Sequence, residues 1–103
     1  MGIFSALFGG SKTNEKVTAM LAKGALIVDV RTPDEYKSGH ISKSVNIPLN
    51  LIPNKVAELK RKNKPIITCC RSGARSGMAA DQLRKAGFEV ENGGSWTSVK
   101  SMM

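Results

Sequence analysis

The chain has 103 residues and a formal net charge of +8, because 16 Lys and Arg outnumber 8 Asp and Glu. Hydrophobic residues make up 41% and aromatic residues only 5%, so the composition predicts one globular domain with an aliphatic core. The two cysteines, Cys69 and Cys70, are adjacent, which excludes a disulfide-stapled secreted scaffold and favours a reducing compartment, the cytoplasm.

The positive charge predicts anionic partners, and its densest run is residues 60–64. No aromatic residues interleave this run to stack on bases, so we do not expect nucleic acid among the partners. Lys and Arg are favoured at the carboxyl end of a helix, where they complement the helix dipole. We therefore interpret the run as the solvated end of a helix.

Residues 1–10 are apolar, but they lack the basic start of a secretory signal and are too short to cross a bilayer. Ala6 stands where an N-myristoylation motif requires Ser or Thr. We expect residues 1–12 to form a flexible apolar segment and residues 13–103 to form the domain, with no transmembrane segment. The alternative is that the apolar segment docks on a partner or on a membrane surface.

Short apolar runs and helical spacings alternate along the rest of the chain. Up to the basic run, the predicted elements are a helix from Thr13 or Asn14 to Gly24, a strand over 25–30, a helix from Pro33 to Gly39, a strand over 44–48 and a helix from Leu51. Beyond it we predict a strand over 65–69, a helix from Ser76 to Gly87 with Met78, Ala79, Leu83 and Ala86 inward, a strand over 88–90, a turn at Gly93-Gly94 and a short helix with Trp96 and Val99. This order predicts an α/β fold, with a central, mostly parallel sheet of four to five short strands flanked by helices.

Cys70 follows the third predicted strand, at the carboxyl end of the sheet, where ligands bind in folds of this class. A helix begins soon after, so the amide N–H groups of the tight loop are expected to point inward and form an anion site. Glycine permits positive φ in the loop, and two arginines add positive charge. These effects favour the thiolate of Cys70, which is the nucleophilic form. The candidate site consists of Cys70 as the catalytic group and Arg71, Ser72, Gly73, Ala74, Arg75 and Ser76 as the substrate-binding loop.

Three stretches of the chain resemble one known family: Cys70–Gly77, Asp29–Ile41 continued by Asn46-Ile47-Pro48, and Gly93-Gly94 with Trp96. They are similar to the active-site loop, the first conserved box and the closing segment of the single-domain rhodaneses. Two features depart from the family pattern. Lys43-Ser44 replaces the usual Gly-Ala, and Cys69 stands where an aromatic or aliphatic residue is common.

The resemblance implies a small three-layer rhodanese-like domain and a sulfurtransferase mechanism. Cys70 would take the sulfane sulfur of a small anionic donor such as thiosulfate, and carry it as a persulfide. A thiophilic acceptor, cyanide or a thiol, would then remove the sulfur, and the thiol of a partner protein is a further acceptor of this kind. Arg71 and Arg75 would bind the donor and stabilise the thiolate. The mechanism requires no metal and no organic cofactor.

Two other functions remain open at this point. Cysteine phosphatases and arsenate reductases use a Cys, five intervening residues and an Arg, a spacing that fits Cys69 and Arg75 but not Cys70. Thr68 stands where the phosphatase signature usually has His. The second alternative is a non-catalytic rhodanese-like binding module, which the presence of the cysteine disfavours.

Several other polar residues are interpreted as structural. Asp29, Arg31 and Glu35 are expected to form a polar network, and His40 is expected to hydrogen-bond near Glu35 or the backbone. Side chains alternate along a strand, so Cys69 is expected to point away from Cys70 and to pack as a small hydrophobe. The two cysteines and His40 do not have the spacing of a zinc site.

Overall fold

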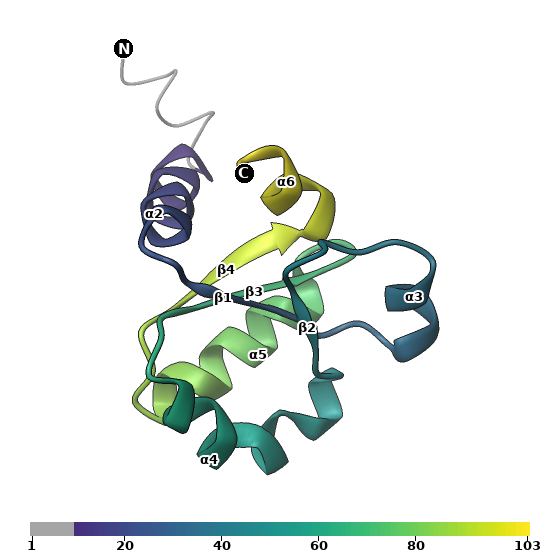
Figure 1. Ribbon diagram of the computed structural model, residues 1–103, viewed down its shortest axis with the longest axis vertical. Coiled ribbons are helices and arrows are strands. Elements are labelled where there is room, and N and C mark those ends of the chain that lie inside the picture. The colour runs from purple at the N-terminus through teal and green to yellow at the C-terminus, as the bar shows by residue number, and fades with distance from the viewer. Residues whose placement is uncertain (1–9) are drawn as a thin grey trace.

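The computed structural model describes residues 10–103 (Figure 1). The strands are β1 Leu26–Asp29, β2 Val45–Asn46, β3 Ile66–Cys70 and β4 Val90–Ser95. The helices are α2 Gly10–Ala22, α3 Pro33–Lys37, α4 Ile52–Lys62, α5 Ala74–Lys85 and α6 Trp96–Ser101, with a 3₁₀ turn η1 Leu49–Leu51 before α4. Residues 1–9 of the segment predicted over 1–12 lie outside the described residues, and Gly10 begins α2. Within the described part of the chain, no helix has the length and apolar character needed to cross a membrane.

The predicted α/β architecture is confirmed. The four strands form one sheet in the order β2-β1-β3-β4, and every neighbouring pair is parallel. Helices α4 and α5 cover one face and α2 and α6 cover the other, which gives three layers (Figure 1). The central strand β3 is buried along its whole length, as the apolar run before Cys70 predicts.

The two faces of the sheet hold separate apolar cores. The core on the α4–α5 side contains Val28, Ile52, Leu59, Ile66, Cys70 and Leu83. The core on the α2–α6 side contains Val17, Met20, Ile27, Ile67, Cys69 and Val99. Cys69 and Cys70 therefore point to opposite faces, as the alternation of side chains along a strand predicts.

The structure corrects several local predictions. Helix α5 begins at Ala74, two residues before Ser76, and its buried residues are Ser76, Ala79, Ala80 and Leu83. Met78 was predicted to face inward, but it lies on the side of α5 opposite these buried residues and is 52% exposed.

The last strand was predicted over 88–90, but β4 spans Val90–Ser95. Gly93-Gly94 therefore lies inside this strand and does not form a turn. A Cβ atom on Gly93 would lie 2.5 Å from Val99 Cγ2 and 2.9 Å from Ile67 Cγ2. Glycine is required at this position because α6 and β3 approach the backbone of β4 closely.

Candidate active site

Cys70 is the last residue of β3, and only residues 71–73 separate it from α5. Gly73 occupies the N-cap of α5 with φ of 101°, in the left-handed region that favours glycine, as the sequence predicts. Glycine has no side chain to cap the helix, so the first amide N–H groups of α5 need another acceptor. The tight connection places the Cys70 side chain beside those groups.

The sulfur of Cys70 accepts hydrogen bonds from the backbone of the loop and the helix. Gly73 N lies 3.0 Å and Ser76 N 3.4 Å from Cys70 Sγ, and Ser76 Oγ lies 3.3 Å away. Ser76 is the third residue of α5, so the sulfur takes the place of a capping oxygen. A negative charge on this atom also faces the positive end of the helix dipole.

The environment of Cys70 favours the thiolate. Burial raises the pKa of the Cys70 thiol, but hydrogen bonds from the Ser76 hydroxyl and from the amides of Ser76, Gly73 and Ser72 lower it and outweigh burial. The pKa is therefore below its ordinary value. Several donors lie around the sulfur, so it is suited to hold negative charge.

Arg75 does not point at the sulfur. Its guanidinium binds the Glu35 carboxylate through two hydrogen bonds, Nη1 to Oε1 at 2.7 Å and Nη2 to Oε2 at 3.0 Å. This contact, together with hydrogen bonds from Thr32, holds the pKa of Glu35 at about 2. Arg71 is exposed, and it makes no ion pair with any residue from 10 to 103. The two arginines of the loop are therefore placed differently, one paired beside the site and one free at the surface.

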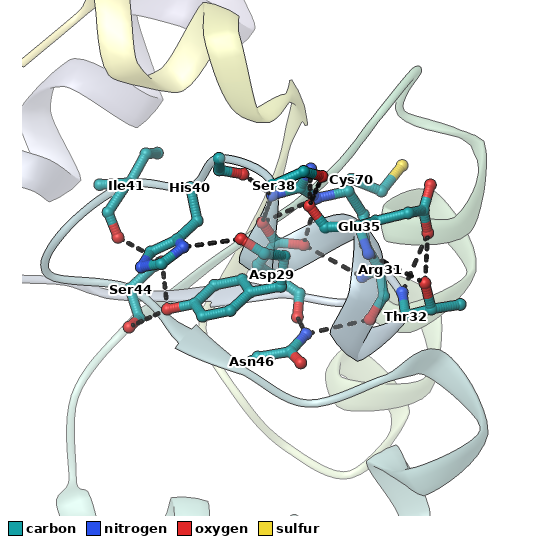
Figure 2. Close-up of polar contacts among 12 residues, drawn as sticks. Asp29, Arg31, Thr32, Glu35, Ser38, His40, Ile41, Ser44, Asn46 and Cys70 are labelled. Atoms are coloured by element: carbon teal, nitrogen blue, oxygen red, sulfur yellow. Dashed lines mark hydrogen bonds and ion pairs between the residues drawn. The ribbon is translucent and has the colours of Figure 1, made fainter.

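Asp29 and Arg31 form a polar network at the carboxyl end of β1, as the sequence predicts (Figure 2). Glu35 was predicted to share this network, but its carboxylate binds Arg75 and Thr32 instead, and only its backbone carbonyl contacts Arg31. The Arg31 Nε and Nη2 atoms bind the Asp29 carboxylate, with the shortest distance at 2.7 Å. The same guanidinium donates to the carbonyl oxygens of Glu35 and Gly39 and lies 4.8 Å from the centre of the Trp96 ring. Arg31 thereby fixes the segment that carries Glu35, the partner of the active-site helix.

His40 has a structural environment, as expected. Its Nδ1 atom lies 2.7 Å from the carbonyl oxygen of Tyr36, and its ring stacks on the Tyr36 ring with centroids 3.8 Å apart. Tyr36 in turn donates its hydroxyl to the Ser44 carbonyl. These contacts close the turn between α3 and β2. Across residues 10–103, no three His, Cys, Asp or Glu side chains are grouped to hold a metal ion.

Sequence reasoning missed Asn92, which lies on β4 beside the loop. Its Oδ1 atom accepts from Ser76 Oγ at 2.7 Å and from Gly94 N at 2.9 Å, and its Nδ2 atom donates to the Gly73 carbonyl at 3.0 Å. No strand signal is present at this position of the sequence, because the predicted strand over 88–90 ended before Asn92. Its relation to Cys70 depends on the pairing of β3 with β4, which no local pattern reveals.

Cys69 has the opposite environment from Cys70. Burial, followed by the nearby charge of Asp29, raises the pKa of the Cys69 thiol to about 12. The side chain packs in the core between the sheet and helices α2 and α6. Cys69 therefore stays a neutral thiol, in keeping with its predicted structural role.

These features define a class of α/β domains that present one ionisable thiol at the carboxyl end of a parallel sheet, in a loop shaped for anions. The family model of the rhodanese-like domain matches residues 13–100. The chain therefore belongs to the rhodanese-like domain family.

Individual relatives agree with this assignment. The uncharacterized Bacillus subtilis protein YqhL is 43% identical over 73% of this chain, and the match spans 58% of YqhL. The Escherichia coli thiosulfate sulfurtransferase PspE is 35% identical over 70% of this chain and 71% of PspE. Among solved structures, an Escherichia coli rhodanese with anions is 32% identical, with a TM-score of 0.66 over 72% of this chain and 89% of that chain.

Proposed function

We propose that this protein is a sulfurtransferase that moves sulfane sulfur from a donor such as thiosulfate to a thiophilic acceptor through a persulfide on Cys70. The observation that carries the proposal is the set of donors around Cys70 Sγ, with Gly73 N at 3.0 Å and both the amide and hydroxyl of Ser76 within 3.4 Å. The family membership and the activity of PspE support the same reaction.

In the first half-reaction the Cys70 thiolate attacks the outer sulfur of thiosulfate. The sulfur–sulfur bond of thiosulfate breaks, sulfite leaves with the electron pair, and Cys70 carries a persulfide anion. In the second half-reaction cyanide or a thiolate attacks the outer sulfur, and the bonding pair returns to Cys70 Sγ as thiolate. No net oxidation of the protein occurs, and a thiol of a partner protein can replace the small acceptor.

The loop residues have distinct proposed roles in these steps. The amides of Gly73 and Ser76 stabilise negative charge on the sulfur, as an oxyanion hole does for oxygen. Arg71, exposed and unpaired within the described chain, binds the incoming anion. Arg75 is held by Glu35 and supplies positive charge beside the sulfur without occupying it. Because Cys70 is fully buried, the exposed loop residues Arg71 and Ser72 have to shift for a donor to reach Sγ.

Mass spectrometry after incubation with thiosulfate tests the proposal. We expect the protein to gain one sulfur atom, and we expect cyanide to remove it with release of thiocyanate. The Cys70→Ser variant should gain none, and the matched Cys69→Ser variant should gain sulfur as the native chain does. Sulfur uptake that survives Cys70→Ser and is lost in Cys69→Ser would contradict the assignment of the nucleophile.

The phosphatase or arsenate reductase alternative needs Cys69 as nucleophile, because only Cys69 has the required spacing to Arg75. The buried Cys69 side chain and its pKa of about 12 argue against that role. Turnover of p-nitrophenyl phosphate by the purified protein would favour it. Full biological function of the Cys70→Ser variant would instead favour a non-catalytic binding module.

We propose that the reaction takes place in the cytoplasm. Both cysteines are free thiols, and the mechanism needs Cys70 reduced at the start of each cycle.

A further inference from the structure

The hydroxyl group of Ser76 has one hydrogen and three nearby acceptors. They are Asn92 Oδ1 at 2.7 Å, Cys70 Sγ at 3.3 Å and the Gly94 carbonyl oxygen at 3.5 Å. Ser76 is fully buried, so bulk water does not offer a further partner. A hydroxyl donates only one hydrogen bond at a time, so these acceptors compete.

The oxygen of Asn92 is the best placed of the three acceptors for a neutral site. Its distance from Ser76 Oγ is that of an ordinary O–H···O hydrogen bond. The orientation of the Asn92 amide is determined on both sides. Gly94 N–H donates to Oδ1, and Nδ2 donates to the Gly73 carbonyl oxygen. If the amide were rotated by 180°, its NH₂ group would face the Gly94 N–H and its oxygen would face the Gly73 carbonyl oxygen, and both hydrogen bonds would be lost.

A thiolate changes the outcome of this competition. Hydrogen bonds to an ionised acceptor are roughly twice as strong as bonds between neutral groups. The Ser76 hydroxyl can reach Cys70 Sγ by rotation about its Cβ–Oγ bond, because 3.3 Å already separates the two atoms. Asn92 Oδ1 keeps the Gly94 amide as a donor after that rotation, so the exchange leaves no buried acceptor empty.

We propose that Asn92 is a positioning residue that competes with Cys70 for the Ser76 hydroxyl, holding its hydrogen while the thiol is neutral and releasing it when the sulfur becomes charged. Asn92 thereby restrains the ionisation of Cys70. A thiolate of higher basicity is a stronger nucleophile but a poorer leaving group. On the proposed function, this restraint favours attack on the sulfur donor over release of sulfur to the acceptor.

The direction in which Asn92→Ala shifts the ionisation midpoint of Cys70 distinguishes two roles of Asn92, competition for the Ser76 hydroxyl and mere support of the loop. If Asn92 competes, Asn92→Ala frees the hydroxyl for the sulfur and moves the ionisation midpoint of Cys70 to lower pH, by about half a unit to one unit. If Asn92 only holds the loop through the Gly73 carbonyl, its loss weakens the hydrogen bonds from the Gly73 and Ser76 amides to the sulfur. The ionisation midpoint of Cys70 then moves to higher pH. Competition also requires Ser76, so in a Ser76→Ala background Asn92→Ala should produce no downward shift.

The experiment is a double-mutant cycle on the native chain, Asn92→Ala, Ser76→Ala and the double variant. The ultraviolet absorbance of the thiolate is followed against pH, and the matched Cys70→Ser protein of each is subtracted. Asn92→Leu, which fills the vacated space, provides the same comparison if the alanine variant does not fold. A downward shift that depends on Ser76 supports the proposal. An upward shift, no shift, or a downward shift that is independent of Ser76 overturns it.

This readout does not require sulfur transfer, so failure of the proposed function is distinguishable from failure of the inference. If no variant takes up sulfur from thiosulfate but the titration cycle behaves as stated, the reaction assignment fails and the role of Asn92 stands. If sulfur transfer is observed and the cycle shows no dependence on Ser76, the reaction assignment is supported and the proposed role of Asn92 fails.

Discussion

Replacing Arg31 with Met should destabilise the fold severely, because it leaves the Asp29 carboxylate buried without its partner. Asp29 is 0% exposed and Arg31 4% exposed, and the guanidinium approaches the carboxylate to 2.7 Å. Breaking a buried ion pair from one side typically costs about 3–5 kcal/mol. Arg31→Met also leaves the Glu35 and Gly39 carbonyl oxygens without a donor, so we expect the upper part of that range.

That loss is large against the roughly 5–15 kcal/mol that stabilises a domain of this size. It corresponds to a fall in the thermal midpoint of roughly 12–40 °C, since about 1 kcal/mol shifts the midpoint by 4–8 °C. Urea unfolding followed by circular dichroism measures the change in free energy directly. The far-ultraviolet signal is preferable to Trp96 fluorescence, because Arg31 lies against the Trp96 ring.

The chain contains a matched control in Arg84 and Asp81. Their closest atoms are 3.1 Å apart, but the side chains are 52% and 70% exposed. Surface pairs of this kind contribute about 0–1 kcal/mol. Asp81→Asn should therefore be nearly neutral, and it keeps the hydrogen bond from Arg84 Nη2 to the Val90 carbonyl oxygen. The double variant Asp29→Leu/Arg31→Met should recover part of the stability lost in Arg31→Met, because no unpaired charge remains buried. Equal losses in Arg31→Met and Asp81→Asn would refute the reasoning.

Three further predictions concern packing and ionisation. Gly93→Ala should cost about 1–3 kcal/mol in the free energy of urea unfolding, because the new Cβ lies 2.5 Å from Val99 Cγ2; an unchanged midpoint would show that α6 moves away freely. The folded-state pKa of Glu35 is about 2 against an ordinary 4.5, so its stabilising contribution is present above pH 4.5 and is lost as the pH falls to about 2. Glu35→Gln should therefore flatten the urea midpoint against pH across that window, and an unaltered slope would contradict the ion pair. At about pH 8, iodoacetamide should modify Cys70 before Cys69 in the native state, as peptide mass spectrometry can show, because burial raises the pKa of Cys69 to about 12.

The local sequence was enough to predict the strand before Cys70, the backbone conformation of the loop that follows it and the orientation of the two cysteines. The apolar run before Cys70 defined a strand buried on both faces, and the glycine three residues later defined the positive φ at the start of α5. The side-chain alternation of a strand separated Cys69 from Cys70. These features depend on contacts between residues a few positions apart, and such contacts are set by backbone geometry alone.

Tertiary structure decided the partners of the active-site loop. Glu35 binds Arg75 from 40 positions away, and Asn92 binds Ser76 from 16 positions away, only because the strand order β2-β1-β3-β4 gathers α3, α5 and β4 around one end of β3. The same pairing made glycine at position 93 a contact surface for α6, where the sequence indicated a turn. Residue types and spacings specify which groups can ionise or donate, but the register between distant strands specifies which of them meet.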